Sequence, residues 1–399
     1  MLNSDSTPAV RPLRSTLLLL AVIAGVTVAN IYYNQPLLDA FRQSFPSHAA
    51  WVGAIPALTQ LGFAVGMLLL APLGDRFDRR KLMLVQMSAM SVALVIAATA
   101  ANLGVLMGAS LVIGIIGHIP QQALPFAAEL APASERGHAV GTVMSGLFLG
   151  ILLARTTAGF IAEYFGWRSV FGASVFALAV LAVLIVARLP KSRPSSALSY
   201  GKLLGSLWHL IVELPELRVA AVTSGALFAS FSVFWSVLAF LLAGAPFHYG
   251  PQAAGLFGIV GAAGALVAPI AGKSADRRGT HAVISFAIAL VVLSYVILAF
   301  SGSSLIGLVI GVVVLDVGVQ AGHISNQSRI YGLKPEARSR INTVYMTAYF
   351  LGGALGSAAA TVAWAHFGWL GVCVAGIGFA AIAGWNHRRG INSVPAQLR

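Results

Sequence analysis

The sequence predicts an all-α membrane protein in which twelve transmembrane helices form two parallel six-helix pseudo-repeats. Composition is the first reason: 58% of the 399 residues are hydrophobic and only 9% are charged, which does not suit a soluble domain of this size. The second reason is that apolar runs reach the ~20 residues that a bilayer core requires. The third is a repeat of polar motifs about 200 residues apart.

Charges, prolines and glycines divide the chain into elements. The expected spans are residues 16–38, 50–73, 82–101, 104–128, 138–163, 167–188, 218–244, 252–272, 281–301, 304–329, 339–364 and 368–387. These form an N-terminal bundle (16–188) and a C-terminal bundle (218–387), joined by a polar cytoplasmic linker (189–217) and flanked by tails 1–15 and 388–399.

The lysines and arginines set the expected orientation. Nearly all of the 25 fall in segments on one side of the twelve spans, so the positive-inside rule places both termini in the cytoplasm. The formal charge of +13 is spread over many short loops, which argues against nucleic-acid binding. The single cysteine, Cys373, excludes an intramolecular disulfide and a cysteine-based metal cluster.

Two pairs of matching segments indicate an internal repeat. Asp75 and Arg76 recur as Asp276 and Arg277 in loops that follow the second and eighth spans. The tripeptide Phe-Gly-Trp closes the fifth span at 165–167 and the eleventh at 367–369. Because a separation of about 200 residues corresponds to six helices, the two halves are expected to share one orientation.

These loops match the signature G-x-x-x-D-x-x-G-R-[RK] in part. The second copy keeps Gly272, Asp276 and Gly279, and the first keeps Asp75 and the arginines at 79 and 80. With N-I-Y-Y-N-Q-P-L-L-D in the first span, the chain resembles the major facilitator superfamily, and within it the drug:proton antiporters and their sugar-efflux relatives. The resemblance implies a monomeric, multi-pass protein of the bacterial inner membrane whose spans one, four, seven and ten line a central cavity.

The sequence departs from that pattern at two places. Arg155 stands in the fifth span, where antiporters of this branch usually carry a glycine-proline motif. The first span has no internal acid, since Asp39 lies at its outer end and Pro36 is expected to break the helix before it. Both departures weaken the antiporter interpretation.

The clustered loop charges are candidates for a cytoplasmic gate. Carboxylates beside cations at helix ends can hold those ends together in one state and release them in another. The gate candidates are Asp75, Arg76, Arg79, Arg80, Glu129, Asp276 and Arg277. The alternative is that the cations only set topology and that Glu129 is a solvated acid at a helix end.

Ionisable residues within the spans are candidates for proton coupling, because such residues are costly in a membrane and by default line a pathway. Asp316, the deepest acid, shares one helix face with Gln320 and His323, and His118 lies at the corresponding place in the fourth span. Asp316 is the expected proton carrier. Its alternative role is a permanent ion pair with Arg155, and either histidine is an alternative carrier.

Polar and aromatic residues of the inner spans are candidates for the substrate cavity. They are Asn30, Tyr33, Asn34, Gln35, Gln121, Gln122, Arg155, Trp235, Gln320 and Tyr345. Among them, Arg155 suits an anionic substrate or a balance for Asp316.

These observations predict a secondary active transporter that exports a small organic solute, such as a drug, sugar or metabolite, in exchange for protons by rocker-switch alternating access. Proton-linked uptake and uncoupled facilitation are the alternatives within transport, and a non-transporting receptor is the alternative outside it. We expect no enzyme activity, metal or cofactor, because the chain carries no Walker sequence, metal cluster or nucleophile with a partnered base.

Overall fold

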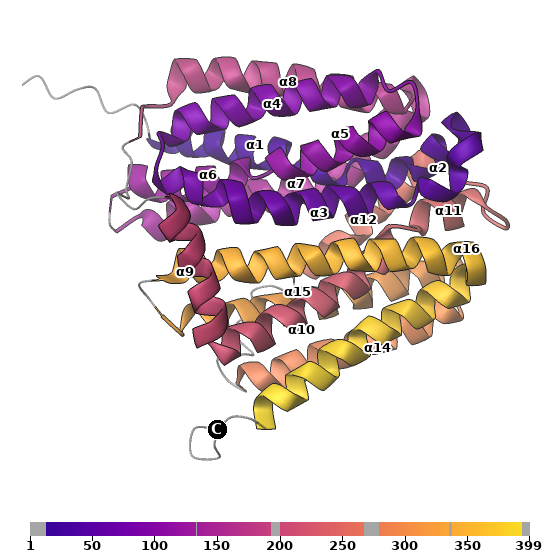
Figure 1. Ribbon diagram of the computed structural model, residues 1–399. Coiled ribbons are helices and arrows are strands. Elements are labelled where there is room, and N and C mark those ends of the chain that lie inside the picture. The colour runs from indigo at the N-terminus through magenta and orange to yellow at the C-terminus, as the bar shows by residue number, and fades with distance from the viewer. Residues whose placement is uncertain (1–12, 133, 193–199, 267–278, 335–336, 393–399) are drawn as a thin grey trace, which may run out of the picture.

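A computed structural model describes residues 13–132, 134–192, 200–266, 279–334 and 337–392 of the chain. In these ranges every regular element is a helix. Ten of the described helices are long and apolar enough to cross a membrane. Figure 1 shows them in two layers, with helices from the first half of the chain in one layer and those from the second half in the other.

The first layer, called here the N-half, comprises α1 to α8. The elements are α1 (Leu13–Tyr32), α2 (Asn34–Ser44), η1 (Pro46–Trp51), α3 (Ala54–Leu70), η2 (Ala71–Asp75), α4 (Arg79–Ala98), α5 (Leu103–Ile116), α6 (Ile119–Leu130), α7 (Arg136–Phe165) and α8 (Trp167–Arg188). Polar caps start two of these helices: the Asp78 side chain accepts from the Arg80 N–H at 2.9 Å, and Asn102 Oδ1 accepts from the Val105 N–H at 3.0 Å.

The second layer, the C-half, comprises α10 to α16. The elements are α10 (Pro215–Trp235), α11 (Leu238–Ala243), α12 (Pro251–Leu266), α14 (Thr280–Ala299), α15 (Leu305–Tyr331) and α16 (Arg338–Asn392). The expected spans 339–364 and 368–387 are joined in α16, which bends at Gly368, where φ is 59°. The expected span 252–272 is described only as far as Leu266.

Three of the expected spans are broken. The first breaks at Tyr33, between α1 and α2, the fourth at Gly117 and His118, and the seventh at Ser236 and Val237. The sequence analysis placed the first break at Pro36, and this was wrong. Pro36 is the third residue of α2, where its missing N–H costs no helical hydrogen bond.

Matching contacts recur in the two halves. A Cβ on Gly25 would lie 2.6 Å from the Gly146 carbonyl oxygen, and a Cβ on Gly225 would lie 2.8 Å from that of Ala348. The α1–α7 and α10–α16 pairs therefore pack through equivalent backbone contacts. Gly166, which ends α7 with φ of 79°, likewise corresponds to the bend at Gly368, because glycine adopts positive φ without steric cost.

The linker contains a helix that the sequence analysis did not predict, α9 (Tyr200–Glu213). Leu203, Leu207 and Leu210 are buried along one side of it, with the i, i+4, i+7 spacing of an amphipathic helix. Figure 1 shows α9 crossing from the N-half to the C-half at one end of the bundle. We call this the basic end, because Arg79, Arg188 and Arg338 lie at the helix termini there. We call the opposite end of the bundle the far end.

Candidate functional site

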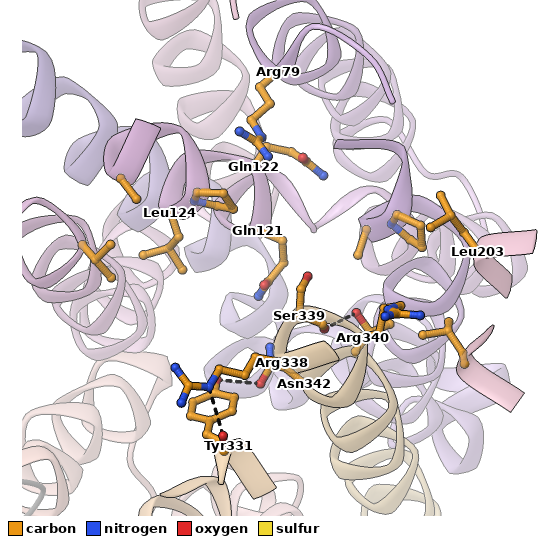
Figure 2. A pocket seen from close by; sticks show the side chains of 17 residues that line it. Arg79, Gln121, Gln122, Leu124, Leu203, Tyr331, Arg338, Ser339, Arg340 and Asn342 are labelled. Atoms are coloured by element: carbon orange, nitrogen blue, oxygen red, sulfur yellow. Dashed lines mark hydrogen bonds between the residues drawn. The ribbon is translucent and has the colours of Figure 1, made fainter. Parts of the chain in front are cut away.

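A cavity of about 740 Å³ lies between the halves at the basic end. The N-half supplies one wall from η2 and α6, and the C-half supplies the other from the end of α15 and the start of α16, as Figure 2 shows. Leu203 and Leu207 of α9 complete it. The polar residues of the lining are Arg79, Gln121, Gln122, Tyr331, Arg338, Ser339, Arg340, Asn342 and Thr343.

The two predicted glutamines of the fourth span reach this cavity. Gln121 is half-buried and extends between the two walls in Figure 2. Gln122 is only 1% exposed, and its Nε2 has no hydrogen-bond partner. A buried amide N–H without an acceptor is costly, so this group is a candidate to bind a ligand.

Between the cavity and the far end, a buried polar cluster joins the halves. Gln60 of α3 donates through Nε2 to Ser357 Oγ of α16 at 3.0 Å, and its Oε1 accepts from Ser232 Oγ at 3.2 Å. Ser236 Oγ donates to the same Ser357 oxygen at 2.8 Å. We call these four residues the polar clamp. Each such bond stabilises the joined state by about 1 kcal/mol.

The sequence analysis missed the polar clamp. Gln60 is nevertheless a long polar side chain within the apolar run of α3, and an intramembrane polar residue is by default functional or paired. That signal was available. The serines carry no comparable signal, because a helical hydroxyl commonly bonds its own i−4 carbonyl.

A second contact between the halves runs along α7 and α12. Thr156 Oγ1 donates to the Gly255 carbonyl at 2.9 Å. A Cβ on Gly159 would lie 2.5 Å from the Pro251 oxygen, and one on Gly258 would lie 3.0 Å from Arg155 Cβ. Gly255 and Gly258 of α12 thus lie at a close contact between the two helices. The halves are therefore in contact toward the far end, where a cavity of about 220 Å³ remains, while the cavity at the basic end is about 740 Å³.

Arg155 lies within this closed region and is 4% exposed. Its Nε donates to Gln35 Oε1 at 2.6 Å, and its Cζ lies 4.0 Å from the Trp235 ring centroid and 4.9 Å from that of Tyr32. Its Nη2 has no hydrogen-bond partner. Tyr32 ends α1, Gln35 lies in the first turn of α2, and Trp235 ends α10, so the breaks in the first and seventh spans meet at this guanidinium. Broken helices of this kind mark binding sites in transporters.

Asp316 is joined to Arg155 through Trp235. The indole Nε1 donates to Asp316 Oδ1 at 3.5 Å, while the indole ring stacks on the guanidinium. Asp316 is 5% exposed, and its other oxygen packs against Gly261 of α12, where a Cβ has no room. Arg155 and Asp316 form no direct ion pair in the described parts of the chain, and both roles considered for Asp316 stay predictions.

The two predicted histidines differ in their surroundings. His118 is fully buried, packs 4.1 Å from the Phe63 ring centroid, and has no partner for either nitrogen. His323 Nδ1 is 3.1 Å from Tyr345 Oη, which donates to Ser224 Oγ at 2.7 Å. Asp316, His118 and His323 were expected to face the cavity. All three lie outside its lining in this state.

Several other cavity candidates hold helices together instead. Asn30 accepts from Ser174 of α8 at 2.6 Å, and Asn34 Nδ2 donates to Thr59 Oγ1 of α3 at 2.8 Å. Tyr33 lines an apolar groove between α1 and α7. Gln320 is half-buried on α15, about one turn from Asp316. None of these four lines the cavity between the halves in this state.

The gate candidates that the structure describes lie in the N-half. Arg79 Nη1 is 2.7 Å from Glu129 Oε2, and Arg80 Nη2 donates to the Val186 carbonyl at 2.7 Å. These bonds join the start of α4 to the ends of α6 and α8, and Arg76 is exposed. Asp276, Arg277 and the side chain of Asp75 lie outside the described residues. The gating role stays a prediction.

Comparison with known proteins shows which family the chain belongs to. The model of the Major Facilitator Superfamily matches residues 17–357. The chain is 41% identical over 380 residues to "Putative uncharacterized transporter YgaY" of Escherichia coli (strain K12), covering 95% of each. It is 36% identical over 386 residues to "Probable transporter SCO4007" of Streptomyces coelicolor, covering 96% of this chain and 89% of that one.

The fold has solved counterparts as well. The structure of the nucleoside transporter NupG superposes with a TM-score of 0.76 at 13% sequence identity, covering 95% of this chain and 99% of that one. A likeness at this identity concerns the fold alone.

Proposed function

Because the chain belongs to the Major Facilitator Superfamily and is a multi-pass membrane transporter, we propose that it exports a small organic solute in exchange for protons. The observation that carries the proposal is the contrast between a hollow basic end and a closed far end. Two half-bundles that pack together toward one end and enclose a cavity at the other can rock to exchange these two ends. The positive-inside rule places the basic end in the cytoplasm, so this state is open inward.

The transport cycle begins with solute entering the cavity from the basic end. Separation of the halves at the far end breaks the polar clamp and parts α7 from α12. Arg155 and Asp316 then become accessible from the opposite side, because α12 glycines cover both in the inward-open state. Solute leaves at that side, and Asp316 takes up a proton there.

Trp235 supplies a physical link between solute and proton. Its N–H bond to Asp316 is charge-assisted only while the carboxylate is ionised, so protonation weakens that bond. The same indole stacks on Arg155. A proton on Asp316 therefore loosens the Trp235 ring that positions the guanidinium. A charged solute group bound to Arg155 would likewise weaken the contact between the guanidinium and this ring.

Asp316→Asn tests the proposal. In proteoliposomes with a trapped pH dye, wild-type protein should change the lumenal pH when drugs, sugars or carboxylates are added in turn. The variant should lose that signal but keep exchange of labelled solute for unlabelled solute. Asp39→Asn, which removes an acid paired with Arg42 at the far end, is the matched control and should keep both. Proton flux that persists in Asp316→Asn contradicts the role of this carboxylate.

A further inference from the structure

We propose that the transported solute is an organic anion: a carboxylate or sulfonate on an apolar or aromatic body. The inference rests on the proposed function and names the substrate class of the same site. It depends on the charges of the cavity wall and on two buried donors without partners.

The cavity wall is cationic. Arg79, Arg338 and Arg340 line it, and no Asp or Glu is among its described lining residues. Arg79 is bonded to Glu129, whereas no acid among the described residues pairs with Arg338 or Arg340. Arg338 is fixed at the wall, because its Nε donates to the Tyr331 carbonyl at 3.0 Å (Figure 2).

Topology alone does not require this pattern. The positive-inside rule accounts for arginines at the basic end but says little about acids. Glu129, Glu135, Glu213 and Glu216 all lie at this end, yet none lines the cavity. A concave surface with low-dielectric walls and charge of one sign concentrates counter-ions. The cavity should therefore attract anions and repel cations.

Two buried donors without acceptors lie at the cavity wall and in the closed region beyond it. Gln122 Nε2, 1% exposed at the cavity wall, has no acceptor. Deeper between the halves, Arg155 Nη2 has none either, although the same guanidinium is held by Gln35 and by aromatic rings. A carboxylate or sulfonate supplies the missing acceptor, and a planar guanidinium suits it geometrically.

The surroundings of Arg155 indicate the chemistry of the uncharged part of the solute. The rings of Tyr32, Phe231 and Trp235 lie 4.9, 5.8 and 4.0 Å from its Cζ. Such rings pack against an apolar or aromatic body once its charge is held. A cationic solute would instead approach Arg155 against its charge, while the nearby carboxylate of Asp316 is occupied by the Trp235 N–H.

The test measures the charge of the cavity directly. A single reporter cysteine replaces Gln121, which extends between the walls, in a Cys373→Ser background. Its reaction rates with sulfonatoethyl and trimethylammonioethyl methanethiosulfonate are each divided by the rates with free cysteine. The anionic reagent should be favoured about tenfold. Reaction with the neutral methyl reagent controls for folding and access.

Two variants test which arginines cause the preference for the anionic reagent. Arg338→Gln with Arg340→Gln should abolish it without changing the neutral-reagent rate. Arg389→Gln removes a basic-end charge that stacks on Trp385 outside the cavity lining, and should leave the preference intact. An anion-to-cation ratio equal to that of free cysteine, or one unaffected by the double variant, overturns the inference.

Three probes of one shape then test the substrate class. Phenylacetate should slow the neutral reagent more than phenylacetamide or phenethylamine does, and Arg338→Gln with Arg340→Gln should remove this protection. Equal or better protection by the amide or the amine overturns the inference. If the amine or amide is preferred while Asp316-dependent proton flux persists, the proposed proton-coupled export stands and the anionic substrate class is wrong. If the anion is preferred but no proton flux is seen, the anionic substrate class stands and proton-coupled export is wrong.

Discussion

The two ends of the bundle close in different ways. At the far end the halves meet through backbone carbonyls packed on glycines and through the polar clamp, with no ion pair between the halves among the described residues. At the basic end the halves enclose a cavity, and the Arg79–Glu129 ion pair stays within the N-half.

This difference bears on the energetics of rocking. Neutral hydrogen bonds and glycine contacts can separate without leaving an unpaired charge, which is the costly outcome when a buried ion pair is broken. The far-end contacts are therefore suited to repeated opening. The cationic wall at the basic end instead remains in contact with water and with the entering solute.

The largest effect is expected from adding bulk to the far-end contact. In Gly255→Leu, the first added carbon would already lie 2.6 Å from the Arg155 carbonyl oxygen, so α12 cannot stay against α7. The variant should hold the far end open and reduce transport by at least about tenfold, a difference of about 1.4 kcal/mol.

The measurement is the reaction of a Gln35→Cys reporter, buried in the closed state, with an impermeant thiol reagent added at the far end. Its rate should rise in Gly255→Leu. Gly172→Leu is the control, since nothing lies within 4 Å of a Cβ there. Equal rates in the two variants would show that the α7–α12 contact does not close this end.

A smaller effect is expected from Gln60→Leu, which removes two hydrogen bonds of the polar clamp. The closed far end should lose about 1–3 kcal/mol, with a matching rise in reporter reactivity. Gln86→Leu is a matched control, because Gln86 is equally buried on α4 but neither of its amide atoms has a partner. Loss of the Gln86 amide should leave the stability of the closed far end unchanged or raise it. If both variants behave alike, the clamp contributes nothing.

The two histidines should respond unequally. His323→Phe breaks the contact with Tyr345 and should change both the rate and the pH profile of transport. His118→Phe removes a ring whose nitrogens have no partner and that already packs on Phe63, so transport should change little. Comparison of pH–rate profiles for the two variants decides this. A larger effect in His118→Phe would reverse the assignment.

The smallest effect is expected at α9. Lys334 Nζ donates to Glu213, and this bond lowers the pKa of that carboxyl. A lowered pKa in the folded state stabilises the protein above the ordinary pKa of Glu, and the contribution disappears as pH falls through the folded value. Glu213→Gln should therefore lower the melting temperature slightly at neutral pH and not at all in acid. Thermal melts across this pH range measure it, and a loss independent of pH contradicts the ion-pair explanation.

Sequence reasoning succeeded where a feature depends on neighbouring residues. Apolar runs located spans such as 167–188, which matches α8 at both ends, and the repeated Phe-Gly-Trp located the turns at Gly166 and Gly368. The spacing of Leu203, Leu207 and Leu210 would also have identified α9, but the polar composition of the linker concealed it.

Features that depend on how the halves meet could not be predicted. Gln60 and Ser357 are 297 residues apart, and nothing in one sequence pairs them. The same is true of Trp235, whose ring separates Arg155 from Asp316 and replaces the direct ion pair considered from sequence. Which polar residues face water also depends on the state, since Asp316 is covered in this one.

The central claim is that the halves exchange their open and closed ends. Spin labels in a Cys373→Ser background can be placed at exposed His48 and His366 across the far end, and at exposed Glu135 and Ser328 across the basic end. Pulsed electron–electron resonance should show the far-end distance lengthening and the basic-end distance shortening together when solute or acid pH is applied. Distances that stay fixed, or that lengthen at both ends at once, would contradict the account.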